Sequence, residues 1–141
     1  MTTFRFSISL FAAASLAVGC ASSGTAPSQM AADQFAGTWK LLSIQPAGQT
    51  EQATPAGADY TLTLTGDRVA SHVDCNTCGG ALLLSGQTVT VGPVLACTRA
   101  ACETMAFENA FTTLLAGEST IAQTPGVLVL SSPRGVLRFA R

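Results

Sequence analysis

The stretch that decides the fold opens with CNTCGG at residues 75–80 and closes with CTRAAC at residues 97–102. It holds four of the five cysteines, with two residues between Cys75 and Cys78, 18 before Cys97 and four before Cys102. This spacing fits a pair of disulfides, a four-thiolate zinc site or a redox-active Cys75–Cys78 pair. A redox pair needs a thiol at a helix N-terminus, whereas the residues after Cys78 are two glycines and a predicted strand.

The N-terminus predicts export. Arg5 precedes an apolar run over residues 8–18, which suits a signal peptide and is too short to span a bilayer. The run ends in LAVG before Cys20, a sequence that resembles a bacterial lipobox. We expect residues 1–19 to be a lipoprotein signal peptide and Cys20 to carry the lipid; ordinary secretory cleavage is the alternative.

The predicted anchor also suggests a location. Ala21 follows Cys20, in place of the Asp that favours retention in the inner membrane, so we expect the outer membrane, facing the periplasm. Residues 20–32 are rich in Ser, Gly, Pro, Gln and Ala, a composition that cannot bury a core and that predicts a flexible tether. The domain then occupies residues 33–141.

Export bears on the cysteines, because disulfides are the usual state of paired cysteines outside the cytoplasm. We therefore predict two disulfides among Cys75, Cys78, Cys97 and Cys102, and no metal. A hairpin turned at Gly86 would bring Cys78 beside Cys97 and Cys75 beside Cys102. The pairing of Cys75 with Cys97 and Cys78 with Cys102 stays open.

Short segments with apolar alternation predict an antiparallel meander. In YTLTLT at residues 60–65, apolar side chains alternate strictly with threonine, which is typical of a half-buried strand. Further strands are predicted at residues 38–44, 68–73, 81–84, 88–91, 119–123, 127–131 and 136–140. Residues 46–57 are predicted to be a loop, and Trp39, the only tryptophan, a core anchor.

One amphipathic helix is predicted after Cys102. Its apolar face consists of Phe107, Ala110, Phe111, Leu114 and Leu115. The predicted fold class is therefore α+β: a strongly curved antiparallel sheet or partial barrel of about eight short strands, packed on one helix.

Composition limits the possible partners. The chain has a net charge of −1, and only 11% of its residues are charged. It contains no basic run that could neutralise phosphates, so nucleic acid is not an expected partner. No motif indicates a cofactor. The membrane is an expected partner, through the anchor at Cys20, and the sequence does not identify a protein or small-molecule partner.

Several motifs resemble the META-domain family, whose bacterial members are HslJ-like envelope lipoproteins. The similar residues are Gly37, Trp39 and Leu41, the Cys75-Asn76 pair with the glycines after it, Thr98-Arg99 with Cys102, and Glu108, Phe111 and Leu114 of the helix. Asp74 stands where that family usually has Gly. The resemblance implies a small antiparallel sheet wrapped on one helix, and implies no enzymatic activity.

Two sets of polar residues are candidates for function. His72, the only histidine, and Asp74 would project from the same strand face, although a surface histidine beside an acid is the simpler interpretation. Asn76, Thr98 and Arg99 form a candidate polar patch, or else bond within the cysteine loop. We expect a lipid-anchored, non-catalytic envelope protein with a binding or structural role. The alternative is an exported thiol-redox or hydrolytic enzyme that uses Cys75/Cys78 or His72.

Overall fold

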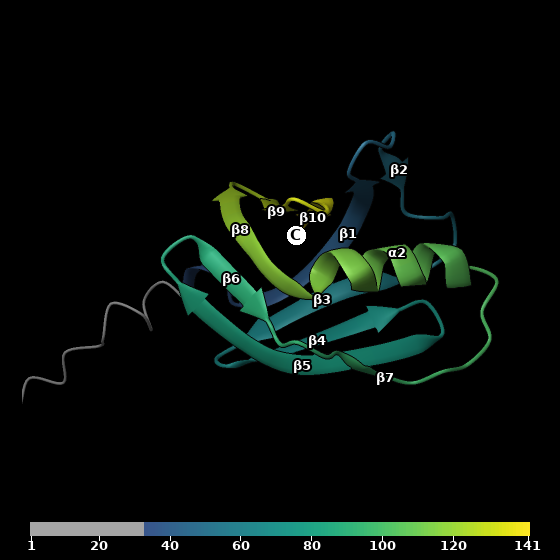
Figure 1. Ribbon diagram of the computed structural model, residues 1–141, viewed down its shortest axis with the longest axis horizontal. Coiled ribbons are helices and arrows are strands. Elements are labelled where there is room, and N and C mark those ends of the chain that lie inside the picture. The colour runs from purple at the N-terminus through teal and green to yellow at the C-terminus, as the bar shows by residue number, and fades with distance from the viewer. Residues whose placement is uncertain (1–32) are drawn as a thin grey trace, which may run out of the picture.

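The computed structural model describes residues 33–141; the predicted signal peptide, Cys20 and the tether lie outside the described residues. The described part is mostly β-structure (Figure 1). The elements are β1 (Gly37–Pro46), β2 (Gln52–Ala53), β3 (Tyr60–Thr65), β4 (Arg68–Val73), β5 (Asn76–Ser85), β6 (Thr88–Val91), β7 (Ala96–Cys97), α2 (Met105–Leu115), β8 (Gly117–Thr124), β9 (Val127–Ser132) and β10 (Gly135–Ala140).

Eight of these strands form a closed antiparallel barrel in the order β1, β3, β4, β5, β6, β8, β9, β10. Pairing of β10 with β1 closes the ring, from Lys40 opposite Ala140 to Pro46 opposite Gly135. The short strands β2 and β7 pair with β1 and β5. The prediction of a strongly curved antiparallel sheet is confirmed, while the partial barrel is corrected to a closed one.

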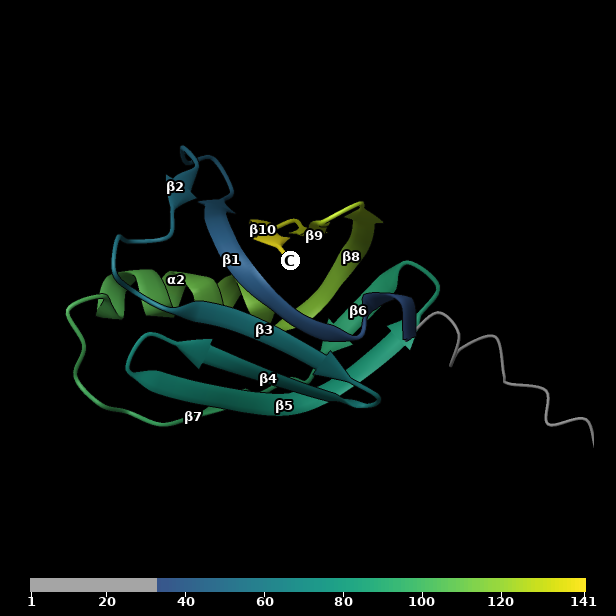
Figure 2. The same cartoon turned by 180° about the vertical axis from the view of Figure 1, so that it is seen from behind.

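α2 is a smaller part of the fold than the predicted α+β class implied. It packs beside β1 and β10, and Figures 1 and 2 show it lying along one side of the barrel. Its buried face includes Phe111, Leu114 and Leu115. The ring of Phe111 meets those of Tyr60 on β3 and Phe139 on β10 edge to face, with centroids 5.7 and 6.4 Å apart. The helix therefore covers one part of a core that strands mostly build.

Side chains alternate along the strands, and the apolar ones point into the barrel interior. Tyr60, Leu62 and Leu64 of β3 are all buried, as the threonine alternation predicts. Trp39 is fully buried, and its indole N–H donates to the Phe35 carbonyl over 2.9 Å. No helix within residues 33–141 is long and apolar enough to cross a membrane.

Candidate functional site

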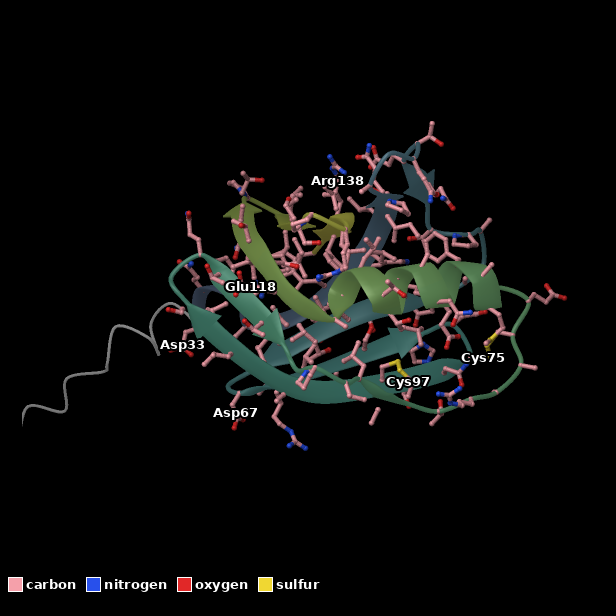
Figure 3. All side chains as sticks on the ribbon, viewed as in Figure 1. Asp33, Asp67, Cys75, Cys97, Glu118 and Arg138 are labelled. Carbon is pink, nitrogen blue, oxygen red and sulfur yellow. A yellow bond between two sulfur atoms is a disulfide. The ribbon has the colours of Figure 1, made fainter. Side chains whose placement is uncertain are left out.

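The two disulfides hold the connection between β6 and α2 against β5. Cys78 and Cys97 lie directly opposite each other in the β5–β7 ladder, with Cα atoms 4.1 Å apart. Cys75, just before β5, is bonded to Cys102, just before α2 (Figure 3). This is the pairing that the hairpin at Gly86 favours, and sulfurs in disulfides are not available as the thiolates of a zinc site.

Asn76, 1% exposed, is the centre of the hydrogen bonds between the bridges. Its side-chain oxygen accepts from the backbone N–H of Ala100 at 2.7 Å and the hydroxyl of Thr98 at 2.9 Å. Its amide nitrogen donates to the Ala100 carbonyl at 3.0 Å. One side chain thus replaces a strand partner for a segment that has no regular pairing of its own.

The same amide nitrogen reaches α2. It lies 3.2 and 3.0 Å from the two carboxylate oxygens of Glu108, which is 5% exposed. Glu108 lies in the first turn of α2, where the helix dipole favours an acid. Its burial was not predicted from the sequence, although Glu108 precedes Phe111 by three residues and Leu115 by seven, and so shares their face.

Of the predicted polar patch, Asn76 and Thr98 bond inside the cysteine segment, while Arg99 lies at the surface. Asn76 and Thr98 bond to each other, and the Thr98 hydroxyl also accepts the backbone N–H of Thr77 at 3.0 Å. Arg99 is exposed and has no ion-pair or hydrogen-bond partner in residues 33–141. Bonding within the cysteine loop therefore accounts for Asn76 and Thr98, and leaves Arg99 available at the surface.

A second polar chain begins at the only tyrosine. The Tyr60 hydroxyl donates to Thr104 at 3.0 Å, and the Thr104 hydroxyl donates to the Asp74 carboxylate at 2.6 Å. Burial raises the pKa of Tyr60; its hydrogen bond with Thr104 lowers it, and the nearby acids Asp74 and Glu108 raise it. Thr104 is the N-cap residue of α2, but its side chain makes no capping bond because its hydroxyl is turned to Asp74.

Asp74 has a φ of 60°, in the left-handed region that glycine adopts most easily. Asp tolerates this region better than most residues, and its backbone N–H donates to the Asp59 carbonyl at 2.7 Å. Glycine would adopt this left-handed turn without strain. In this chain, Asp supplies both the turn and the acceptor for Thr104.

The expectation that His72 and Asp74 project from the same strand face is wrong. β4 ends at Val73, so Asp74 belongs to the turn, and its carboxylate bonds to Thr104. His72 is exposed, and its Nδ1 lies 3.2 Å from the Asp59 carbonyl oxygen. Ser71 points to the opposite face and donates to the Thr61 carbonyl. These three side chains do not assemble a Ser–His–Asp arrangement.

The C-terminal end of α2 has a cap that no local sequence pattern predicts. Arg134, from the β9–β10 turn, donates to the carbonyls of Ala116 at 2.5 Å and Glu118 at 3.3 Å. A cation at this end complements the helix dipole, and the last turn of α2 supplies none itself. Only the tertiary fold brings residues 116 and 134 together.

One groove lies between α2 and the segment that leads into β7. It has a volume of about 380 Å³ and is lined on the β7 side by Val94, Leu95 and Arg99. Glu108 and Thr112 line it from α2. Within residues 33–141 no group of three or more His, Cys, Asp or Glu side chains is arranged to hold a metal ion.

The META-domain profile matches residues 32–141 of the chain. The chain belongs to the META-domain family. The family motifs in this chain supply the internal contacts of the fold: Trp39 in the core, Asn76 between the bridges, and Glu108 and Phe111 on the buried face of α2.

Among solved structures, this META domain is similar to the NMR structure of a protein from Burkholderia xenovorans. The two are 26% identical, with a TM-score of 0.64, and the match covers 85% of this chain and 94% of that one. No curated protein matches the chain. The barrel with its helix is therefore a fold that this META domain shares with a solved structure.

Proposed function

We propose that this META-domain protein is a lipid-anchored module of the bacterial cell envelope, which acts by binding or structural support rather than by catalysis. The observation that carries the proposal is the double bridge around Asn76. Cross-links of this kind persist in an oxidising compartment, which fits the predicted signal peptide. Lipid at Cys20 would hold the domain at the membrane, and the tether would set its reach.

The bonding of the candidate groups supports a non-catalytic role. Cys75 and Cys78 are bonded to different partners across the connection, so a reversible bridge between them would require breaking both disulfides. His72 bonds to a backbone carbonyl, and Asp74 to a threonine. The groups that remain free to meet a partner are the exposed Arg99 and the groove that it lines.

Metabolic labelling tests the anchor. A palmitate analogue is expected to label the full chain and to spare Cys20→Ala, and fractionation is expected to place the labelled protein in the outer membrane. Cys97→Ala is the matched control, because it removes a cysteine without touching the predicted lipid site. An unlabelled wild-type protein contradicts the anchor, and recovery from the inner membrane contradicts the location.

Activity screening tests the non-catalytic role. The oxidised protein is expected to lack thiol-oxidoreductase and esterase activity above the level of His72→Ala and of a variant with Cys75 and Cys78 both replaced by Ala. An activity that either substitution abolishes would establish the enzyme and overturn the proposed role.

A further inference from the structure

The groove between α2 and residues 93–99, which we term the α2–β7 groove, combines an apolar wall with a buried acid. Val94 is 76% exposed and Leu95 is partly buried, so apolar surface faces solvent along one side. Met105 adds apolar surface at the helix end of the same groove. Its volume of about 380 Å³ lies in the range of small-molecule sites.

Glu108 is the one acid among the residues that line the groove. The side chain lines the groove, yet only 5% of the residue is exposed. Its two carboxylate oxygens share one protein donor, the amide nitrogen of Asn76. An ionised carboxylate can accept about four hydrogen bonds. The acid is therefore positioned by the fold with most of its accepting capacity unused by the described residues.

No cation of the described chain forms an ion pair with Glu108. The ion pair found in residues 33–141 joins Arg138 to Glu51, on the outer side of the β1–β10 pair. Arg99 lines the same groove, but neither bonds to Glu108 nor forms any other ion pair among these residues. A buried carboxylate is stabilised when a cation with hydrogen-bond donors reaches it.

We propose that the α2–β7 groove binds a small organic cation, a primary ammonium group on an apolar chain. The ammonium would donate to Glu108, and the apolar chain would lie along Val94, Leu95 and Met105. Arg99 would lie at the rim and weaken the binding of cations by like-charge repulsion. This inference deepens the proposed binding role and rests on it, since it assigns that role a site and a ligand class.

Calorimetric titration of the full-length, disulfide-bonded protein with n-hexylammonium tests the site. We expect saturable binding that weakens as salt is raised, because the contact is electrostatic. Two probes of the same chain length, hexanoate and n-hexanol, are expected to bind at least tenfold more weakly. Equal binding of n-hexanol would show a merely apolar groove and overturn the assignment of the ammonium to Glu108.

Glu108→Gln is the direct variant, because glutamine keeps an oxygen for the Asn76 amide and removes the charge. It is expected to weaken n-hexylammonium binding at least tenfold, while Glu103→Gln, an exposed acid outside the groove, changes it less than twofold. Unchanged affinity in Glu108→Gln overturns the proposal. If that variant does not fold, Arg99→Gln decides, with a two- to fivefold gain expected at low salt and no gain contradicting the site.

The outcomes separate the two proposals. If Cys20 is labelled and no probe binds, the cation site fails and the anchored module stands. If n-hexylammonium binds through Glu108 and Cys20 is unlabelled, the site stands and the anchor fails.

Discussion

The cysteine segment, residues 75–102, and the C-terminal meander, residues 117–140, form different parts of one barrel by different means. The meander passes through β8, β9 and β10 with two-residue turns and an unbroken register, and it contains no cysteine. The connection from β6 to β8 instead leaves the barrel. It passes through the short strand β7 and the helix α2 before the chain re-enters the barrel at β8. Both disulfides and the Asn76 hydrogen bonds hold this connection.

The difference shows where this fold needs added stabilisation. Consecutive strands joined by tight turns lose little conformational entropy when the turn closes, whereas a long connection loses more. β7 has only two residues, so its ladder cannot hold the connection by itself. Covalent and buried polar links thus lie where backbone pairing is weakest.

Removing the bridges is expected to have the largest effect. The Cys75–Cys102 bridge joins residues 27 positions apart, and the Cys78–Cys97 bridge joins residues 19 apart. In the chain-entropy model each bridge adds about 3–4 kcal/mol to the free energy of unfolding. Denaturant titration of oxidised and reduced protein is expected to differ by roughly this amount per bridge. A reduced protein as stable as the oxidised one would show that the segment does not depend on its cross-links.

Phe111→Ala tests the attachment of α2 to the barrel. The ring is fully buried against Tyr60 and Phe139, so its loss is expected to lower the free energy of unfolding by about 3–5 kcal/mol. Leu83→Ala is the control, because Leu83 is 67% exposed and is expected to matter little. A loss below about 1 kcal/mol for Phe111→Ala would contradict the burial of this face.

Gly135→Ala tests the meander at the point where it meets β1. Gly135 has a φ of 145°, and an added Cβ would collide with the Gln45 carbonyl oxygen. We expect a loss of about 2–4 kcal/mol from strain and overpacking. Gly126→Ala has a positive φ of 78° but open space around its Cβ, so it is expected to lose only about 1 kcal/mol. Equal losses would contradict the tight closure of the barrel.

Tyr60→Phe is expected to have the smallest effect, about 1 kcal/mol at neutral pH from the lost bond to Thr104. Burial raises the pKa of Tyr60 above its ordinary 10.0, so the folded protein retains the phenol proton more tightly than the unfolded chain. Its contribution is complete below pH 10 and is lost as pH rises through the folded pKa.

Absorbance at 295 nm reports this titration directly, because Tyr60 is the only tyrosine. Unfolding measured from pH 9 to 11 is expected to show a steeper fall in stability for the wild type than for Tyr60→Phe. Parallel falls would contradict a raised pKa.

Local pattern predicted much of the fold. The alternation in residues 60–65, the turn residues and the 3–4 residue spacing of Phe107, Phe111 and Leu114 each correspond to an observed element. The predicted start of β5 at Ala81 is wrong by five residues, since the strand begins at Asn76. Asn and Gly have low strand propensity, and here pairing with β4 and β7 overrides it.

Long-range contacts account for the other differences. Barrel closure pairs β1 with β10 across almost the whole domain, and no local pattern records that register. The two-residue strand β2 lies in the predicted loop and depends on β1. Of the predicted polar patch, Asn76 and Thr98 lie in the internal hydrogen-bond network. The sequence indicates the burial of Glu108 only through the helix face that it shares with Phe111 and Leu115.

The cysteines hold the fold through two disulfides, and non-reducing peptide mapping tests this most directly. Protein purified from the envelope without reductant is expected to yield Cys75 linked to Cys102 and Cys78 linked to Cys97, with no free thiol among these four. Four free thiols with stoichiometric zinc would contradict the claim and establish a metal site. A reversible bridge between Cys75 and Cys78 would contradict it in favour of redox chemistry.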